Sequence, residues 1–188
     1  MTSPAPGPTI QTPRLILRPT AMADFDRWCD FMGDAETARF IGGVQAPSQV
    51  WRGMMAMAGA WTLSGVAMFS VIERSSGQWI GRIGPWQPHG WPGTEVGWSL
   101  HRDAAGKGYA LEAATAAIDH AFDHLGWTDV IHCIDPDNGP SIRLAERLGS
   151  RNRGRGQLPA PFQDATIDLW GQTRDEWRDN RRRLLAAG

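Results

Sequence analysis

The chain has 188 residues, of which 41% are hydrophobic and 21% are charged, and its formal net charge at pH 7 is −1. Because a domain of this size buries roughly 70% of the surface of its unfolded chain, it needs no disulfide or metal ion to hold a core. The near-neutral charge argues against a general nucleic-acid binder, and no apolar run approaches the ~20 residues of a membrane span.

The N-terminal segment lacks the basic and apolar regions of a signal peptide. Residues 1–11 carry three prolines and are predicted to be a disordered tail that precedes one domain, residues 12–188. Cys29 and Cys133 are the only cysteines and have no C-x-x-C spacing, which argues against a thiolate metal site and favours a reducing compartment. We therefore expect a cytoplasmic protein without a bound metal.

The first half of the chain is predicted to form a strand, three helices and two further strands. Leu15 and Leu17 alternate with residues of the opposite face, which indicates the first strand. The apolar face of the third helix is predicted to comprise Trp51, Met54, Met55, Ala58 and Trp61. The predicted ranges are 12–18, 23–32, 34–41, 47–63, 66–73 and 79–86.

Residues 87–93 form a loop rich in proline and glycine before the next predicted strand. Loops held by strands often carry substrate contacts, and Trp86, His89 and Trp91 lie in or beside this one. A single histidine in a loop is more often solvated than catalytic, so His89 is not assigned as a base.

The centre of the chain is a short strand, a glycine turn and a long helix. Residues 95–100 alternate as a strand, and the alanines of residues 110–125 recur at helical spacing before Gly126. Between them, Gly106 and Gly108 allow backbone conformations in which a ligand can approach the main chain closely. The first helical turn offers unpaired N–H groups and the positive end of the helix dipole, so the turn is either an anion site or a plain connection.

Two common phosphate motifs do not match this turn. A P-loop requires Ser or Thr directly after Gly-Lys, whereas Gly108 follows Lys107 here. The dinucleotide fingerprint G-x-G-x-x-G is not met either, because position 111 is Leu.

Residues 129–134 are predicted to be a buried strand that contains His132 and Cys133. Adjacent strand residues point to opposite faces, so the two side chains are not expected to act as a local catalytic pair. A structural role in packing is the preferred interpretation. The predicted elements that follow are a helix over 140–148, a strand around 151–155, a strand over 163–170 and a helix over 173–187.

The turn from Ala105 to Ala110 resembles the pyrophosphate loop of the GNAT N-acetyltransferases. That loop has Arg or Gln, two variable residues, Gly, one variable residue, and Gly or Ala; here Ala105 replaces the leading Arg or Gln. The run Gly-Lys-Gly-Tyr-Ala, followed by Glu112 and Ala113, is similar to the branch of ribosomal-protein N-terminal (alanine/serine) acetyltransferases. In that branch the leading position often departs from the general rule.

A second motif resembles the same branch. The run from Asn138 to Gly149 contains an Asn, a Ser three residues later (Ser141) and a helix-ending Gly, as in the second signature of the branch. The order of the predicted elements also agrees with the GNAT fold. The resemblance implies an α/β (α+β) acyl-CoA N-acyltransferase fold with a mixed central sheet of about seven strands flanked by helices.

The resemblance further implies acetyl-CoA as co-substrate, with no metal, and direct attack of an amine on the acetyl carbon in a ternary complex. In the family the pantetheine arm lies beside the strand matched by residues 95–100, where it splays from the strand at Val130, and the glycine loop holds the pyrophosphate. The implied cofactor-binding residues are Trp98, Ser99, Leu100, Ala105, Gly106, Lys107, Gly108, Tyr109, Ala110, Asn138 and Ser141.

Glu95 and Ser141 are the candidate catalytic residues. Glu95 shares a strand face with Gly97 and Ser99 and is predicted to deprotonate the amine, directly or through water. The alternative for Glu95 is an ion pair with an arginine of a neighbouring strand. Ser141 is predicted either to protonate the departing thiolate or to cap and pack its helix.

Two further alternatives remain open from the sequence, and one more segment has a preferred interpretation. The methionines of residues 47–63 either pack in the core or line a substrate cleft. Arg151, Arg153 and Arg155 share a strand face and either reach a CoA phosphate or lie on a solvated edge. The C-terminal helix, with five arginines in residues 173–187, is interpreted as a solvated face and not as a nucleic-acid arm.

The acceptor is expected to be a primary amine on a protein N-terminus or a small molecule, and the tryptophans favour an apolar or cationic one. The expected partners are acetyl-CoA and this amine, with neither nucleic acid nor a membrane, and the expected state is a monomer or a homodimer. The alternative function is a non-catalytic acyl-CoA-binding sensor or interaction module, because such a protein would keep the same loop.

Overall fold

The computed structural model describes residues 7–186 and contains one mixed sheet of eight strands, in the order β1-β2-β3-β4-β5-β6-β8-β7. The strands are β1 (Ile10–Gln11), β2 (Leu15–Arg18), β3 (Phe69–Glu73), β4 (Trp79–Trp86), β5 (Glu95–Leu100), β6 (Asp129–Ile134), β7 (Arg151–Gly156) and β8 (Ile167–Thr173). Neighbouring strands are antiparallel except for β5 and β6, which are parallel. The predicted α/β fold with a mixed sheet is confirmed.

The sheet has one strand more than the sequence suggested. Ile10 and Gln11 pair with Leu17 and Ile16, so the last part of the segment expected to be a tail forms an edge strand. Residues 1–6 of that segment lie outside the described residues. A strand of two residues is too short to show alternation, so only its pairing with β2 reveals it.

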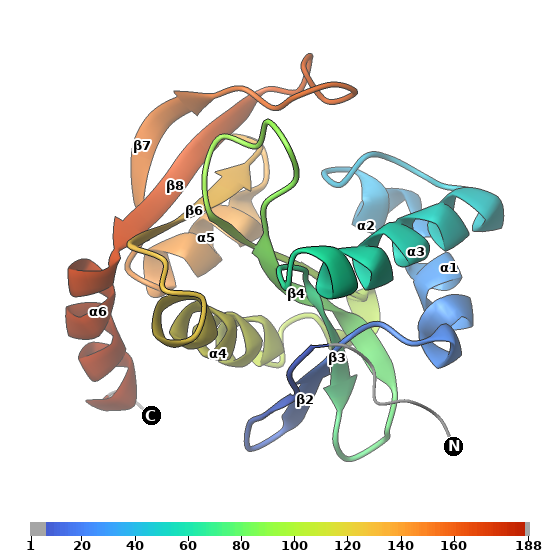
Figure 1. The fold of residues 1–188 in the computed structure, drawn as a ribbon, viewed down its shortest axis with the longest axis horizontal. Coiled ribbons are helices and arrows are strands. Elements are labelled where there is room, and N and C mark those ends of the chain that lie inside the picture. The colour runs from blue at the N-terminus through green and yellow to red at the C-terminus, as the bar shows by residue number, and fades with distance from the viewer. Residues whose placement is uncertain (1–6, 187–188) are drawn as a thin grey trace.

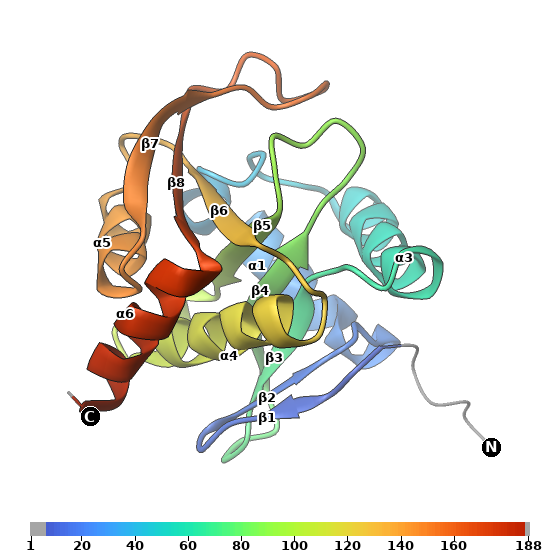
Figure 2. The same ribbon diagram turned by 60° about the vertical axis from the view of Figure 1, so that its left-hand side comes forward.

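The helices flank the sheet on both faces (Figures 1 and 2). They are α1 (Phe25–Gly33), α2 (Ala35–Ala38), α3 (Pro47–Leu63), α4 (Tyr109–Asp123), α5 (Gly139–Arg147) and α6 (Arg174–Ala186). Helices α1 and α3 lie on one side of β4, and α4 crosses the opposite face. The predicted alanine face of α4 is confirmed, since Ala114, Ala117 and Ala121 are fully buried. None of the helices within residues 7–186 combines the length and the apolar character needed to cross a bilayer.

Helix α3 has the predicted range, but one residue of its predicted apolar face was wrong. Trp51 is 48% exposed, whereas Val50 and Met57 are buried together with Met54 and Trp61. These four buried positions follow the i, i+4, i+7, i+11 stripe of an amphipathic helix. Trp51 lies one position away from that stripe, so its side chain points into solvent.

The last strand begins and ends later than predicted. Residues 163–166 are exposed and precede β8, which continues to Thr173 because its end pairs with Asp129 of β6. Gly171 lies inside the strand, where a Cβ atom would be 2.6 Å from the carbonyl oxygen of Val130. Only glycine fits this close approach, so the neighbouring strand β6 requires a glycine at position 171.

Candidate active site

Strands β5 and β6 separate soon after they meet. Their only paired residues are Glu95 and Ile131, and the Ile131 N–H donates to the Thr94 carbonyl at 2.9 Å. One step further along, the Val96 carbonyl is bonded to a side chain, His132 Nδ1, at 2.7 Å. A gap therefore opens between the two strands beyond Val96.

The main-chain groups that face this gap follow from the alternation of an antiparallel ladder. The His101 N–H donates to Ile80 on β4, whereas the carbonyls of Thr94 and Val96 face β6. Alternation then directs the main-chain groups of Trp98 and Leu100 into the gap and those of Ser99 toward β4. Of the three predicted contact residues on β5, two present main-chain groups to the gap.

The glycine turn precedes α4 at one end of this gap. Gly106 and Gly108 have φ values of 75° and 78°, in the left-handed region that favours glycine, and Gly108 is the N-cap of α4. The main-chain amides from Gly106 to Leu111 donate no hydrogen bond to any residue of the described chain. They are therefore free to bind an anionic group at the helix N-terminus.

A cavity of about 370 Å³ lies between this turn, β5 and α5. Its lining includes Trp98, Leu100, Ala105, Gly106, Gly108, Tyr109, Ala110 and Ser141, all of which the sequence predicted. Lys107 is not among the lining residues; it is exposed, with Nζ 6.0 Å from the centre of the Tyr109 ring. Arg143 and Arg147 of α5 supply positive charge on the opposite wall, and the sequence did not single them out.

Residues of the connection between β1 and β2 hold the glycine turn in place. Arg14 forms an ion pair with Glu112 of the first turn of α4, with Nε 2.6 Å from Oε2, and its Nη1 donates to the Lys107 carbonyl at 2.8 Å. Thr12 and the Arg14 main chain also donate to the Glu112 carboxylate. Burial alone would raise the pKa of Glu112, but these hydrogen bonds hold it below its usual value.

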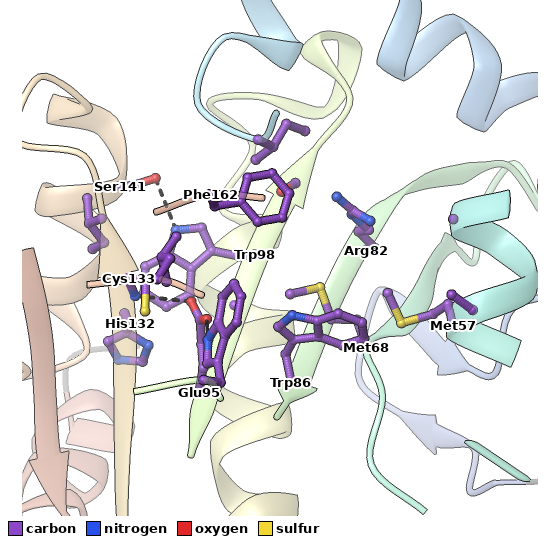
Figure 3. Close-up of a pocket in the computed structure, with 18 of the residues that line it drawn as sticks. Met57, Met68, Arg82, Trp86, Glu95, Trp98, His132, Cys133, Ser141 and Phe162 are labelled. Atoms are coloured by element: carbon purple, nitrogen blue, oxygen red, sulfur yellow. Dashed lines mark hydrogen bonds between the residues drawn. The ribbon is translucent and has the colours of Figure 1, made fainter. Parts of the chain in front are cut away.

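A second cavity, of about 350 Å³, contains Glu95 (Figure 3). The Glu95 side chain is 6% exposed, and its carboxylate accepts hydrogen bonds from Trp91 Nε1 and from the Cys133 N–H at 3.0 Å. Burial raises the pKa of Glu95, and the two donors oppose that rise. No basic side chain within residues 7–186 forms an ion pair with Glu95, so the alternative of an ion pair is not observed.

His132 and Cys133 both contribute to this cavity but do not bond to each other. His132 is 1% exposed; its Nδ1–H donates to Val96 and its Nε2 accepts from Ser150 Oγ at 2.9 Å. Burial lowers the pKa of His132 to about 4, so the ring is neutral at physiological pH. Burial also raises the pKa of the Cys133 thiol, which is therefore not a nucleophile at neutral pH.

The two cavities meet at Trp98 and Ser141, which line both of them. Trp98 Nε1 donates to Ser141 Oγ at 3.2 Å, and Asn138 Oδ1 accepts from the Ser141 N–H as the N-cap of α5. Asn138 and Ser99 also line the Glu95 cavity. Trp98 of the predicted binding strand and Ser141 of the second sequence motif thus lie together at the boundary of the two cavities.

Other side chains of this region had no role predicted from the sequence, or had a role left open between two alternatives. Arg82 of β4 lines the Glu95 cavity, and so do Met57 of α3 and Met68. Met54 belongs to the buried core, as Met57 does, but it does not line the cavity. The arginines of β7 lie on a solvated edge, where Arg153 pairs with Glu176 and Arg155 with Asp168. The chain carried no local signal for Arg82, because its role depends on which strand lies beside β4.

No group of three or more His, Cys, Asp or Glu side chains within residues 7–186 is arranged to hold a metal ion. The site consists instead of one buried carboxylate, one hydroxyl, a gap between strands and a helix N-terminus. This arrangement suits a bound anion at the turn and proton transfer at Glu95.

Comparison with known proteins identifies the family of this chain. Residues 14–151 match the acetyltransferase (GNAT) domain. The chain is 33% identical over 152 residues to the uncharacterized N-acetyltransferase p20 of Bacillus licheniformis, covering 78% of this chain and 84% of that protein. It is 29% identical over 147 residues to the uncharacterized N-acetyltransferase YnaD of Bacillus subtilis, covering 77% and 84%.

Solved structures agree in fold. A crystal structure of an acetyltransferase from Agrobacterium tumefaciens matches with a TM-score of 0.76 and 30% identity, over 89% of this chain and 95% of that one. A ribosomal-protein-S5-alanine acetyltransferase from Vibrio fischeri matches with a TM-score of 0.70 over 90% and 98% of the two chains, but at 16% identity it shows the fold alone. The domain match covers most of the chain, and this chain therefore belongs to the GNAT family of acetyltransferases.

Proposed function

We propose that this protein transfers the acetyl group of acetyl-CoA to a primary amine by direct attack in a ternary complex. One observation carries the proposal: the cavity at the glycine turn and the cavity at Glu95 share Trp98 and Ser141. A donor held at the turn can therefore extend through the gap between β5 and β6 until its thioester lies beside the buried carboxylate.

The residues present fit acetyl-CoA. The free amides of residues 106–111 and the dipole of α4 suit the pyrophosphate, and Arg143 and Arg147 add positive charge on the facing wall. The main-chain groups of Trp98 and Leu100 suit the amides of the pantetheine arm, as in strand addition. Acetyl-CoA supplies the activated acetyl thioester, and residues 12–188 act as one catalytic domain.

The reaction needs a base, an oxyanion donor and an acid. Glu95 takes a proton from the acceptor ammonium, and the amine nitrogen then forms a bond to the acetyl carbon. A main-chain N–H of Trp98 or Leu100 in the gap stabilises the oxyanion that develops on the acetyl oxygen. The carbon–sulfur bond breaks, the sulfur takes a proton from Ser141, Ser141 regains a proton from the former amine nitrogen, and CoA leaves as the thiol beside the neutral amide.

We place the protein in the branch of ribosomal-protein N-terminal acetyltransferases on the strength of the two sequence motifs from Ala105 to Ala113 and from Asn138 to Gly149. The acceptor is then an amine of a protein N-terminus or of a small molecule. We propose a cytoplasmic location, where acetyl-CoA and reduced thiols are available, and a monomeric or homodimeric state.

The test is release of free CoA thiol on incubation with acetyl-CoA and a panel of primary amines, followed by mass measurement of the amine product. Amine-dependent thiol release with a mass gain of one acetyl group supports the proposal. Binding of acetyl-CoA without turnover of any amine in the panel overturns it and favours a non-catalytic acyl-CoA-binding module.

A further inference from the structure

Arg82 lies in the Glu95 cavity without a partner. Its Nε atom is inaccessible to solvent and forms no hydrogen bond, and no residue within 7–186 forms an ion pair with its guanidinium. Figure 3 shows the guanidinium in the cavity, apart from the cluster around Glu95. The residue as a whole is partly buried, and a cation without a partner in such a place favours the binding of an anion.

The surrounding protein does not neutralise Arg82. Across the sheet it is opposite Ser70 on β3 and Ser99 on β5. Ser70 Oγ donates to Asp24, but that carboxylate is already paired with both terminal nitrogens of Arg18. The guanidinium lies over the ring of Trp28, whose centroid is 5.3 Å from Cζ. Burial lowers the pKa of Arg82 to about 10, which leaves it a cation at neutral pH.

Strand register places Arg82 and Glu95 on one face with space between them. Trp86 is opposite Glu95, and Arg82 is opposite Ser99. The pair between them is Gly84 and Gly97, so neither strand places a side chain in the middle of this face, and the Met68 methyl group packs against Gly97 there. Ser99 follows Glu95 by four positions along the strand, which is about 13 Å between their Cα atoms.

We propose that Arg82 binds a carboxylate of the acceptor, so that the substrate of this enzyme is an amine that also carries a carboxylate group. The proposal rests on the acetyl transfer proposed above and narrows its acceptor. Arg82 is the only cation and Glu95 the only carboxylate among the described residues that line the cavity. The acceptor ammonium matches Glu95, and one carboxylate matches the fork of a single guanidinium.

The rest of the lining defines the body of this acceptor. Five aromatic side chains and two methionines surround the space between the charges: Trp28, Trp86, Trp91, Trp98, Phe162, Met57 and Met68. Such a lining suits an apolar or aromatic chain and offers few polar groups to a sugar or a polyamine. The spacing of the two charges predicts that an amine and a carboxylate several bonds apart bind better than the two groups of glycine.

The test compares matched acceptors and matched variants. The acceptors are ω-amino carboxylates of increasing chain length, apolar α-amino acids and the carboxamide of each. A further acceptor is a tripeptide amide that has a free N-terminal amine and no carboxylate. The variants are Arg82→Met, which keeps an apolar stem against Trp28, Arg82→Lys, which keeps the charge, and the control Arg151→Met on the exposed edge strand. Acetyl-CoA-dependent thermal stabilisation is measured for each variant.

The wild type should prefer each carboxylate over its carboxamide by 10- to 100-fold in kcat/KM. Arg82→Met should lose that preference by lowering kcat/KM for carboxylates alone, Arg82→Lys should keep part of it, and Arg151→Met should keep all of it. An equal loss for carboxylates and carboxamides, or efficient turnover of the neutral tripeptide amide that is independent of Arg82, overturns the proposal.

A binding measurement separates this proposal from acetyl transfer itself. With CoA present, the N-acetylated ω-amino carboxylates should raise the melting temperature of the wild type and of Arg151→Met, but not of Arg82→Met. If no amine turns over while this Arg82-dependent binding is found, acetyl transfer fails and the carboxylate site stands. If amines turn over and no carboxylate binds through Arg82, the carboxylate site is overturned alone.

Discussion

The indole of Trp98 donates its N–H to the hydroxyl oxygen of Ser141 at 3.2 Å, where the two cavities meet. An indole nitrogen can only donate, so the Ser141 oxygen is the acceptor and its own hydrogen is left to point elsewhere. The Trp98 ring is itself fixed against His132, with 4.4 Å between ring centroids. The hydrogen bond from Trp98 therefore orients the Ser141 hydroxyl group so that it can donate its own hydrogen where the CoA thiolate is proposed to form.

Ser141→Ala should therefore lower kcat by about 10- to 100-fold and leave the KM for acetyl-CoA nearly unchanged. Its stability should change by no more than about 1 kcal/mol, because Asn138 caps α5 through the main chain of residue 141. Trp98→Phe, which keeps an aromatic ring but removes the donor, should give a smaller loss of kcat. Steady-state kinetics and urea unfolding of both variants check this, and an unchanged kcat for Ser141→Ala would exclude the acid role.

Glu95→Gln should lower kcat/KM for the amine by about 10²- to 10⁴-fold. Since burial raises the pKa of Glu95, its base form is reached only above the usual range of a glutamate, and activity should fall as pH drops through that raised pKa. The measurement is a pH–rate profile with an acceptor of low amine pKa. Protonation of the amine then does not mask the acidic limb of the profile, where activity falls because Glu95 is protonated. Glu146→Gln on the exposed face of α5 is the matched control and should keep the limb. A limb that persists in Glu95→Gln would assign the base to another group.

Gly108→Glu should abolish stabilisation by acetyl-CoA. A ligand at ~100-fold excess over its Kd adds about 2.7 kcal/mol, which raises the melting temperature of a domain of this size by roughly 5–10 °C. The substitution places a carboxylate where the pyrophosphate is proposed to bind. Gly126→Glu is the matched control, because Gly126 also has a left-handed backbone, with φ 70°. A Cβ atom added there would meet nothing within 4 Å, and the residue lies just beyond the other end of α4. Equal melting shifts in both variants would contradict a phosphate site at Gly108.

Arg14→Gln should weaken acetyl-CoA binding by about 3- to 10-fold with little effect on stability. The Arg14 side chain is 48% exposed, so its ion pair with Glu112 contributes less than about 1 kcal/mol. Its bond to the Lys107 carbonyl, however, holds the turn in the conformation that presents its amides. Calorimetric titration with CoA measures the change, and Arg153→Gln, which breaks a surface pair of similar exposure on β7, should leave CoA affinity intact.

The fold should lose stability on acidification through His132. Its folded pKa of about 4 lies below the value of 6.5 expected when unfolded, so the unfolded chain binds the proton first and stability falls as pH drops from 6.5 toward 4. Between pH 7 and pH 5 this amounts to about 2 kcal/mol. Urea unfolding at the two pH values measures it. His132→Gln should be less stable at pH 7 but should show a smaller difference between pH 7 and pH 5, and an unchanged difference would contradict the buried neutral histidine.

Local patterns in the sequence were sufficient for most of the fold. The ranges of β4, β5, β6 and α3 agree with those predicted, because periodicities of 2 and 3.6 report which face of an element is buried. The turn at Gly106 and Gly108 was likewise predicted from glycine itself, since its left-handed backbone is a local property. The sequence by itself thus determined the order of most elements, most of their buried faces and the conformation of the turn where an anion is proposed to bind.

Only the tertiary structure decided what each functional side chain faces. Glu95 was named from its strand, but its donors, Trp91 and the Cys133 main chain, come from a loop and from β6. Arg82 shares a cavity with Glu95 only because β4 and β5 pair in a register that leaves two glycines between them. Register and strand divergence are set by contacts between segments far apart in the chain, and neither periodicity nor propensity encodes such contacts locally.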